Sequence, residues 1–140
     1  VEQQFELGLR VAAHDMVPIL EPEVDINAPR KAEAESYMLK CINECLAKVP
    51  EDTKLIFKLT IPTQANLYAD LMKDPRVVRV VALSGGYSTE KANELLGQNN
   101  GMVASFSRAL HQDLRFQQTE EEFDTALKAA VDSIFEASIK

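Results

Sequence analysis

The chain has 140 residues and a formal net charge of −7, so it can bury one core but lacks the basic face that nucleic-acid binding requires. Its apolar runs all fall short of the roughly 18–20 residues that cross a bilayer. We therefore expect a globular protein that binds neither nucleic acid nor membrane.

Helical and strand-like patterns alternate along the whole chain. A helix is predicted over residues 2–14, a short strand over residues 17–21 and a helix over residues 30–49. A capping box at Thr119 opens the last helix, whose expected inner face is Phe123, Leu127, Ala130, Val131 and Ile134. Between these, strands are predicted over residues 54–62, 77–83 and 101–106, with helices over residues 66–73 and 89–97.

The order of one helix and then four strand–helix units predicts an α/β fold with a parallel sheet and right-handed crossovers. No linker divides the chain, so residues 1–140 are expected to form a single segment. Two architectures fit this order: an open doubly wound sheet, and a piece of a TIM barrel, (β/α)8. A whole barrel takes about 250 residues, so four units correspond to half of one.

Lys58 is a charged side chain in the middle of an apolar strand. Strand periodicity places it on one face with Ile56 and Thr60. An ammonium among apolar neighbours is costly to desolvate unless it is paired or loses its proton. A neutral lysine is a nucleophile that forms a Schiff base with a carbonyl. The pattern therefore fits either a catalytic lysine or a lysine whose side chain extends to water.

Polar groups follow the predicted strands at their carboxyl ends, where parallel α/β folds bind ligands. Glu21 and Glu23 follow the first strand on one face. Two close carboxylates repel, and one of them can stay protonated and act as a general acid. The alternative for these two residues is a solvated acidic loop.

The third and fourth strands end in groups that suit a phosphate. The sequence SGG at residues 84–86 allows close backbone approach, and the helix start after it offers unpaired amides to an anion. Ser107 and Arg108 follow the fourth strand, and a guanidinium beside a hydroxyl binds phosphate. Barrels frequently hold phosphate after strands 7 and 8. Taken singly, each motif also fits an ordinary turn or a surface ion pair.

Four ordered motifs carry a family resemblance. They are VPILEPE at residues 17–23, LTIP at residues 59–62 directly after Lys58, LSGGYS at residues 83–88, and FSRAL at residues 106–110. In this order and spacing the chain resembles the class I fructose-bisphosphate aldolases, the metal-independent Schiff-base lyases, and most closely their compact bacterial form. The resemblance covers essentially the whole chain and implies strands 5 to 8, the C-terminal half of the family's barrel.

The resemblance also implies an activity and a role for each motif. The activity is reversible cleavage of fructose 1,6-bisphosphate to dihydroxyacetone phosphate and glyceraldehyde 3-phosphate, in glycolysis and gluconeogenesis, with no metal or cofactor. Lys58 matches the Schiff-base lysine, Glu21 the general acid and base, and Glu23 a supporting acid. The residues that match the family's phosphate contacts are Ser84, Gly85, Gly86, Ser107 and Arg108.

Three alternatives stay open. The chain could be a non-catalytic half barrel or phosphate-binding module, another Schiff-base lyase of sugar phosphates, or an open flavodoxin-like domain in which Lys58 is structural. Half a barrel exposes sheet edges and apolar faces. We therefore expect two kinds of partner: a sugar phosphate as substrate, and the N-terminal half of the barrel or another chain.

The chain start and the cysteines indicate a compartment. Residues 1–4 lack the basic and apolar regions of a signal peptide, and the absence of an initial methionine indicates a processed or excised piece. Cys41 and Cys45 lie four apart, which is not the spacing of zinc pairs. We expect reduced thiols in a cytoplasmic protein, with a plastid location left open.

Overall fold

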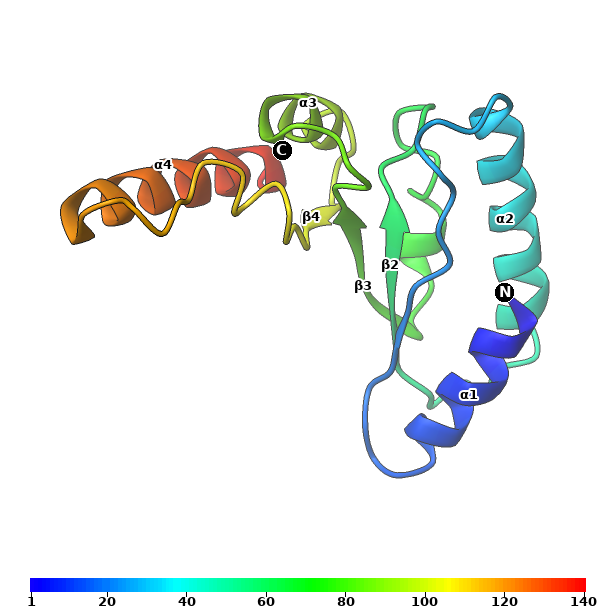
Figure 1. Cartoon of the computed structure of the whole chain (residues 1–140). Coiled ribbons are helices and arrows are strands. Elements are labelled where there is room, and N and C mark those ends of the chain that lie inside the picture. The colour runs from blue at the N-terminus through cyan, green and yellow to red at the C-terminus, as the bar shows by residue number, and fades with distance from the viewer.

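The computed structural model describes all 140 residues. Its centre is one parallel four-stranded sheet in the order β1-β2-β3-β4, connected by helices (Figure 1). The α/β class is therefore confirmed. Doubly wound sheets reverse their strand order at a switch point, whereas this order is sequential, as in a barrel segment. The elements are α1 (Glu2–Ala12), β1 (Ile19–Leu20), α2 (Lys31–Leu46), β2 (Leu55–Thr60), η1 (Leu71–Lys73), β3 (Val77–Leu83), α3 (Thr89–Leu96), β4 (Val103–Ala104) and α4 (Glu120–Ser138).

Three elements depart most from the sequence prediction. The first and fourth strands shrink to the two-residue β1 and β4, which lie at the sheet edges and pair on one side only. The helix predicted over residues 66–73 is wrong, since only the 3-10 turn η1 forms there. Asn66 has a φ of 62°, and its backbone N–H donates to Asn99 at 2.8 Å. Its side chain in turn accepts from the Asn100 N–H at 2.9 Å, so a turn replaces the helix start.

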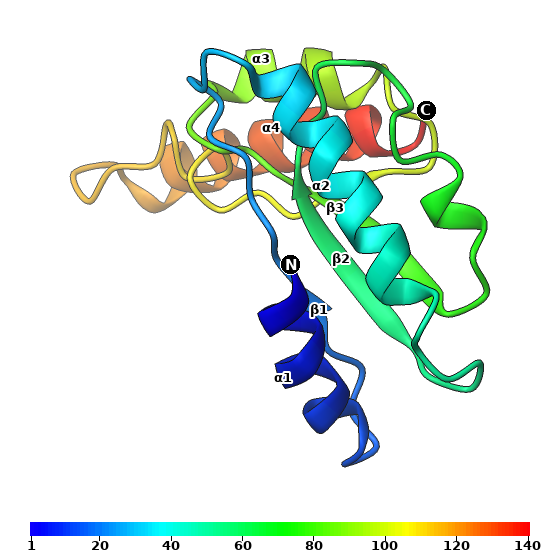
Figure 2. The same cartoon turned by 90° about the vertical axis from the view of Figure 1, so that its right-hand side faces the viewer.

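The helices α1 and α2 cover one face of the sheet, and α2 crosses in front of β2 and β3 (Figure 2). Leu55, Phe57 and Leu59 of β2 are completely buried in this layer, as their alternation in the sequence predicted. The ring of Phe5 in α1 lies 5.8 Å from the ring of Phe57. The α2 side of the same core contains Met38, Ile42 and Leu46.

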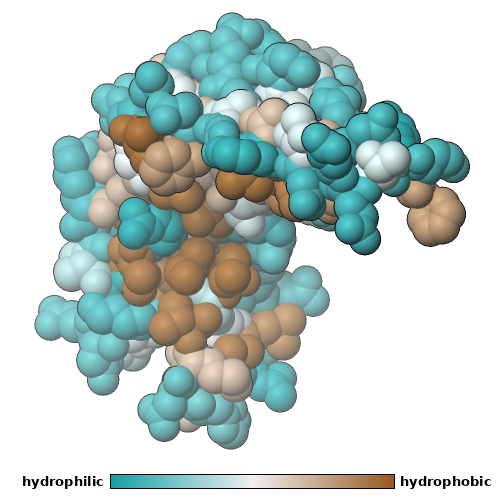
Figure 3. All heavy atoms as spheres, turned by 90° about the vertical axis from the view of Figure 1, so that its left-hand side faces the viewer, coloured by the Kyte–Doolittle hydropathy of each residue, from teal (hydrophilic) through white to brown (hydrophobic).

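The opposite face of the sheet is open. Burial alternates along residues 17–21, because Pro18 and Leu20 are buried while Val17 and Ile19 are 47% and 52% exposed. Figure 3 shows apolar side chains gathered across this side of the molecule. Large exposed apolar patches mark interaction surfaces or binding grooves, and no element of this chain covers this one.

The helix α4 projects away from the sheet (Figure 1). Its C-terminal end packs on α3 and β4, where Ala137 is buried. The predicted inner face is borne out only in part, since Leu127, Ala130 and Ile134 are half-buried whereas Phe123 is 37% and Val131 is 47% exposed. The apolar residues recur at helical spacing, but α4 extends beyond the sheet and no other element of the chain covers its N-terminal part.

None of the helices combines the length and apolarity that crossing a bilayer requires.

Candidate active site

The structure brings Lys58 and Glu21 together. The Nζ atom of Lys58 lies 2.8 Å from Oε2 of Glu21, an ion pair between β2 and the residue that follows β1. The side chain of Lys58 is 26% exposed and that of Glu21 is 44% exposed. The sequence indicated a buried lysine, whereas the structure leaves it half-buried because it lies on the open face of the sheet. Glu23 is also exposed and forms no ion pair.

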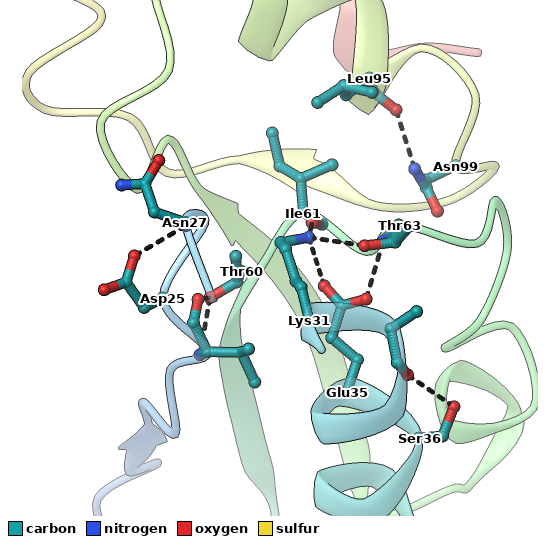
Figure 4. Close-up of polar contacts among 12 residues, drawn as sticks. Asp25, Asn27, Lys31, Glu35, Ser36, Thr60, Ile61, Thr63, Leu95 and Asn99 are labelled. Carbon is teal, nitrogen blue, oxygen red and sulfur yellow. Dashed lines mark hydrogen bonds and ion pairs between the residues drawn. The ribbon is translucent and has the colours of Figure 1, made fainter. Parts of the chain in front are cut away.

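The acidic segment, defined here as residues 21–24, is held by side chains from two other elements. The backbone N–H of Glu21 donates to Oε1 of Gln4 in α1 at 2.7 Å. At the other end, Oγ1 of Thr60 accepts from the Val24 N–H at 3.0 Å and donates to the Val24 carbonyl at 2.8 Å (Figure 4). Sequence reasoning did not find either anchor.

The glycine turn after β3 lies beside Arg108. A Cβ atom at Gly86 would lie 3.9 Å from Nη1 of Arg108, so the guanidinium reaches the turn. Arg108 is exposed and forms no ion pair. Ser84, the first residue of the turn, is buried, whereas Ser107 is exposed and its hydroxyl forms no hydrogen bond. The structure thus places a guanidinium without an ion-pair partner next to a glycine turn, an arrangement that suits an anion.

The amides at the start of α3 are less available than the sequence indicated. The Thr89 N–H donates to Oε1 of Gln112 at 2.9 Å, and the Lys91 N–H donates to Oγ of Ser88 at 3.2 Å. These two donors of the first turn are already satisfied within the chain. An anion at this edge would therefore rely on the turn and on Arg108.

The loop after β1 crosses the end of β2 and touches the same turn. Gly85 has a φ of +62°, and a Cβ atom there would lie 2.6 Å from Cγ2 of Ile26 and 4.0 Å from Cγ2 of Thr60. Glycine is thus required at position 85 by its backbone conformation and by Ile26. Ile26 was missed because an isoleucine in a polar loop gives no signal of the strand end it covers.

A buried ion pair on the other side of β2 was also missed. Glu35 of α2 is fully buried and pairs with Lys31, whose Nζ also donates to the Ile61 carbonyl at 2.9 Å and to Oγ1 of Thr63 at 3.1 Å (Figure 4). The Thr63 N–H donates to Oε2 of Glu35 at 2.9 Å. Burial, and then the charge of Glu35, raise the pKa of Tyr68 beside it. This cluster fixes the chain immediately after β2.

Metal-binding groups and cysteines add no further candidate. Nowhere do three or more His, Cys, Asp or Glu side chains converge as metal ligands. Cys41 and Cys45 are both free and half-buried in α2. The chemistry at the carboxyl edge of the sheet therefore consists of an amine, two carboxylates, hydroxyls and a guanidinium.

The fold and this edge together define an α/β chain of parallel strand–helix units, whose carboxyl edge carries an amine–carboxylate pair and a glycine turn with an arginine next to it. No family model matches the chain. It is 52% identical over 139 residues, 99% of its length, to the class 1 fructose-bisphosphate aldolase of Clostridium acetobutylicum. The resemblance inferred from the four motifs is thereby confirmed. The chain spans only 47% of that relative, so it is homologous to about half of a class 1 fructose-bisphosphate aldolase, consistent with a C-terminal half.

Proposed function

We propose that this chain is the C-terminal half of a class I fructose-bisphosphate aldolase, with Lys58 as its Schiff-base nucleophile. The observation that carries the proposal is the 2.8 Å contact between Lys58 and Glu21 at the carboxyl edge of a parallel sheet. Ligands of such folds bind at this edge. The 52% identity to a class 1 fructose-bisphosphate aldolase supports the same assignment.

The pair supplies both protonation states that the first step needs. Lys58 attacks as a neutral amine, and dehydration of the resulting carbinolamine needs an acid. Transfer of one proton from Lys58 to Glu21 across the ion pair creates the amine and the acid together. Glu23, two residues further along the same segment, supports this exchange as the second carboxylate.

The proposed reaction then follows from the iminium. Lys58 adds to the ketone carbon, and Glu21 protonates the departing hydroxyl, which leaves as water. The iminium accepts the electron pair of the C3–C4 bond while the C4 hydroxyl gives its proton to a neighbouring carboxylate, which releases the aldose phosphate. Protonation of the enamine and addition of water release dihydroxyacetone phosphate and regenerate Lys58. The iminium is the electrophile, so the cleavage needs no metal.

The glycine turn and Arg108 provide the phosphate site in this proposal. The uncompensated guanidinium beside Gly86 supports this role, because arginine binds phosphate in a bidentate, charge-assisted manner. Ser84, Gly85 and Gly86 would line one side of the phosphate, and Ser107 with Arg108 the other. The phosphate next to the ketone would then fix C2 of the substrate near Lys58.

We further propose that residues 1–140 supply strands 5 to 8 of the barrel and that an N-terminal half completes it. The exposed Val17 and Ile19 on the open sheet face support this, since a closed barrel fills its interior with such side chains. The missing half belongs to the same polypeptide or to a partner chain. We place the activity in glycolysis and gluconeogenesis in the cytoplasm.

Borohydride trapping in the full-length protein tests the function. With fructose 1,6-bisphosphate or dihydroxyacetone phosphate, reduction should add a triose-phosphate mass to the peptide that carries Lys58 and to no other lysine. Lys54, the exposed residue immediately before β2, is the internal control. Labelling at another lysine would contradict the assignment of Lys58 as the Schiff-base nucleophile. A panel of other sugar phosphates separates this enzyme from other Schiff-base lyases, and assays with and without the N-terminal half test a non-catalytic role.

A further inference from the structure

The ion pair alone cannot fix the geometry of Glu21. Its carboxylate is 44% exposed and stands on a residue that follows a strand of only two residues. Ion pairs with this much solvent access contribute little to stability. A proton-transferring group nevertheless needs a defined position, because a misplacement of 1 Å costs about a hundredfold in rate. Other contacts must therefore hold the acidic segment in place.

Thr60 provides such a contact at one end of the segment. It is 1% exposed, and its single hydroxyl both donates to the Val24 carbonyl and accepts from the Val24 N–H, at 2.8 Å and 3.0 Å. Thr60 lies on the same face of β2 as Lys58, two residues further along the strand. The hydroxyl therefore ties the acidic segment to the strand that carries the nucleophile. As a β-branched residue, Thr60 also has a restricted χ1 angle, which makes the tie stiff.

Gln4 provides the contact at the other end. Its side-chain oxygen accepts from the backbone N–H of Glu21 at 2.7 Å. The acidic segment is therefore held at residue 21 from α1 and at residue 24 from β2, and both carboxylates lie within this span.

We propose that Thr60 and Gln4 are positioning residues that hold the acidic segment so that Glu21 stays within proton-transfer distance of Lys58. This inference rests on the proposed aldolase function and adds to it the residues that set the geometry of its acid. Neither residue touches the substrate in this assignment; both act through Glu21. The functional contribution of Thr60 is its hydroxyl, since valine has the same shape without the hydrogen bonds.

The test uses the full-length protein with Thr60→Val, Thr60→Ser, Glu21→Gln and the double variant of Thr60→Val with Glu21→Gln. Thr53→Val is the matched control, because Thr53 precedes the same strand, is half-buried and forms no side-chain hydrogen bond. Steady-state kcat and KM, borohydride labelling at Lys58 and the melting temperature are measured for each.

We expect Thr60→Val to lower kcat by about 10- to 100-fold with KM changed less than about threefold. Thr60→Ser should restore kcat to within about threefold of wild type, and Thr53→Val should leave it unchanged. If Thr60 acts through Glu21, Thr60→Val should slow the Glu21→Gln variant by less than about twofold. Gln4→Met, at a half-buried helix position, removes the acceptor of the Glu21 N–H and should lower kcat in the same direction.

The outcomes separate this inference from the proposed function. Wild-type protein labelled at Lys58, with Thr60→Val and Gln4→Met both at full kcat, overturns the positioning role and leaves the aldolase assignment standing. An equal loss in the wild-type and Glu21→Gln backgrounds also overturns it, because Thr60 would then act through another group. Wild-type protein without any label at Lys58 overturns the function and this inference together. If Thr60→Val fails to fold, Gln4→Met decides.

Discussion

Glu21 stands opposite Lys58 because of the register between their strands. In the parallel pair, Ile19 aligns with Ile56 and Leu20 with Phe57. Glu21 lies two residues after Ile19, and Lys58 lies two residues after Ile56. Side chains two apart point to the same face of a sheet, so Glu21 and Lys58 meet on the face of Ile19 and Ile56. The 2.8 Å contact between their charged atoms is therefore a consequence of sheet pairing, and a shift of one residue would break it.

Replacing Lys58 and replacing Glu21 should each impair catalysis, but the two variants should fail at different steps. Lys58→Arg keeps the positive charge beside Glu21 but lacks the amine, so we expect kcat to fall by at least about 10³-fold, with no borohydride label. Glu21→Gln keeps the amine and loses the acid, so we expect a loss of about 10²- to 10⁴-fold and slow labelling at Lys58. Rapid-quench labelling distinguishes the two variants. Normal turnover by Lys58→Arg would contradict the proposed role.

The sequence predicted the two central strands, β2 and β3, better than it predicted the elements around them. The β-branched run of β3 and the alternation in β2 specify strands, because burial on a sheet requires that pattern. The first and fourth strands are shorter than predicted. Each pairs on one side only, and the residue types of a strand do not show whether it lies at the edge of a sheet. Glu35 could have been found, because it lies three residues before Met38 on the buried stripe of α2. A lysine–glutamate spacing of four is, however, usually read as a surface pair.

Gly85 should tolerate no side chain. Gly85→Ala places a Cβ in the left-handed region and 2.6 Å from Ile26, so we expect a loss of about 2–4 kcal/mol in unfolding free energy from strain and overpacking together. Adding Ile26→Ala should relieve the steric part only. Gly97→Ala is the control, because Gly97 has an ordinary helical φ of −61°. Denaturant melts measure all of these, and equal stability of Gly85→Ala and wild type would contradict the steric argument.

Removing one member of the Lys31–Glu35 pair should destabilise the protein strongly. Glu35 is fully buried and Lys31 is 10% exposed, so either Lys31→Met or Glu35→Gln leaves the other group without its partner in a low-dielectric site. We expect a loss of about 3–5 kcal/mol for each single variant and a smaller loss for the Lys31→Met, Glu35→Leu double variant. The exposed pair Lys128–Asp132 has the same spacing, so Lys128→Met should change stability little. If variants at Lys31–Glu35 and at Lys128–Asp132 lost similar amounts of stability, burial would not be the cause of the loss at Lys31–Glu35.

Phosphate affinity should depend on the guanidinium of Arg108. Arg108→Lys keeps the charge but loses the two-pronged geometry, and Arg108→Met loses both. We expect KM for fructose 1,6-bisphosphate to rise about 10-fold in the first and more in the second, while the borohydride label still forms at Lys58 when substrate saturates. Arg115 is the control, because its guanidinium is already engaged by the Gln112 and Leu114 carbonyls at 2.6 Å and 2.8 Å. An unchanged KM in Arg108→Met would exclude this residue from the phosphate site.

Asp74 should give the protein a pH-dependent stability in acid. The hydrogen bonds from Arg76, at 2.7 Å and 2.9 Å, lower the pKa of the Asp74 carboxyl, and Arg76 also donates to the Leu46 and Val49 carbonyls at the end of α2.

A carboxyl whose pKa is lower in the folded state stabilises the protein above its unfolded pKa of about 3.9, and this contribution disappears as pH falls through the folded value. We therefore expect Asp74→Asn to cost about 1–3 kcal/mol between about pH 5 and 8 and to approach wild type below about pH 4. Urea melts across this range measure the difference. Asp70→Asn, at a 94% exposed partner of Lys73, should show a much smaller effect. A constant gap between wild type and Asp74→Asn down to about pH 2 would mean that the charge of Asp74 is not what holds Arg76 at the end of α2.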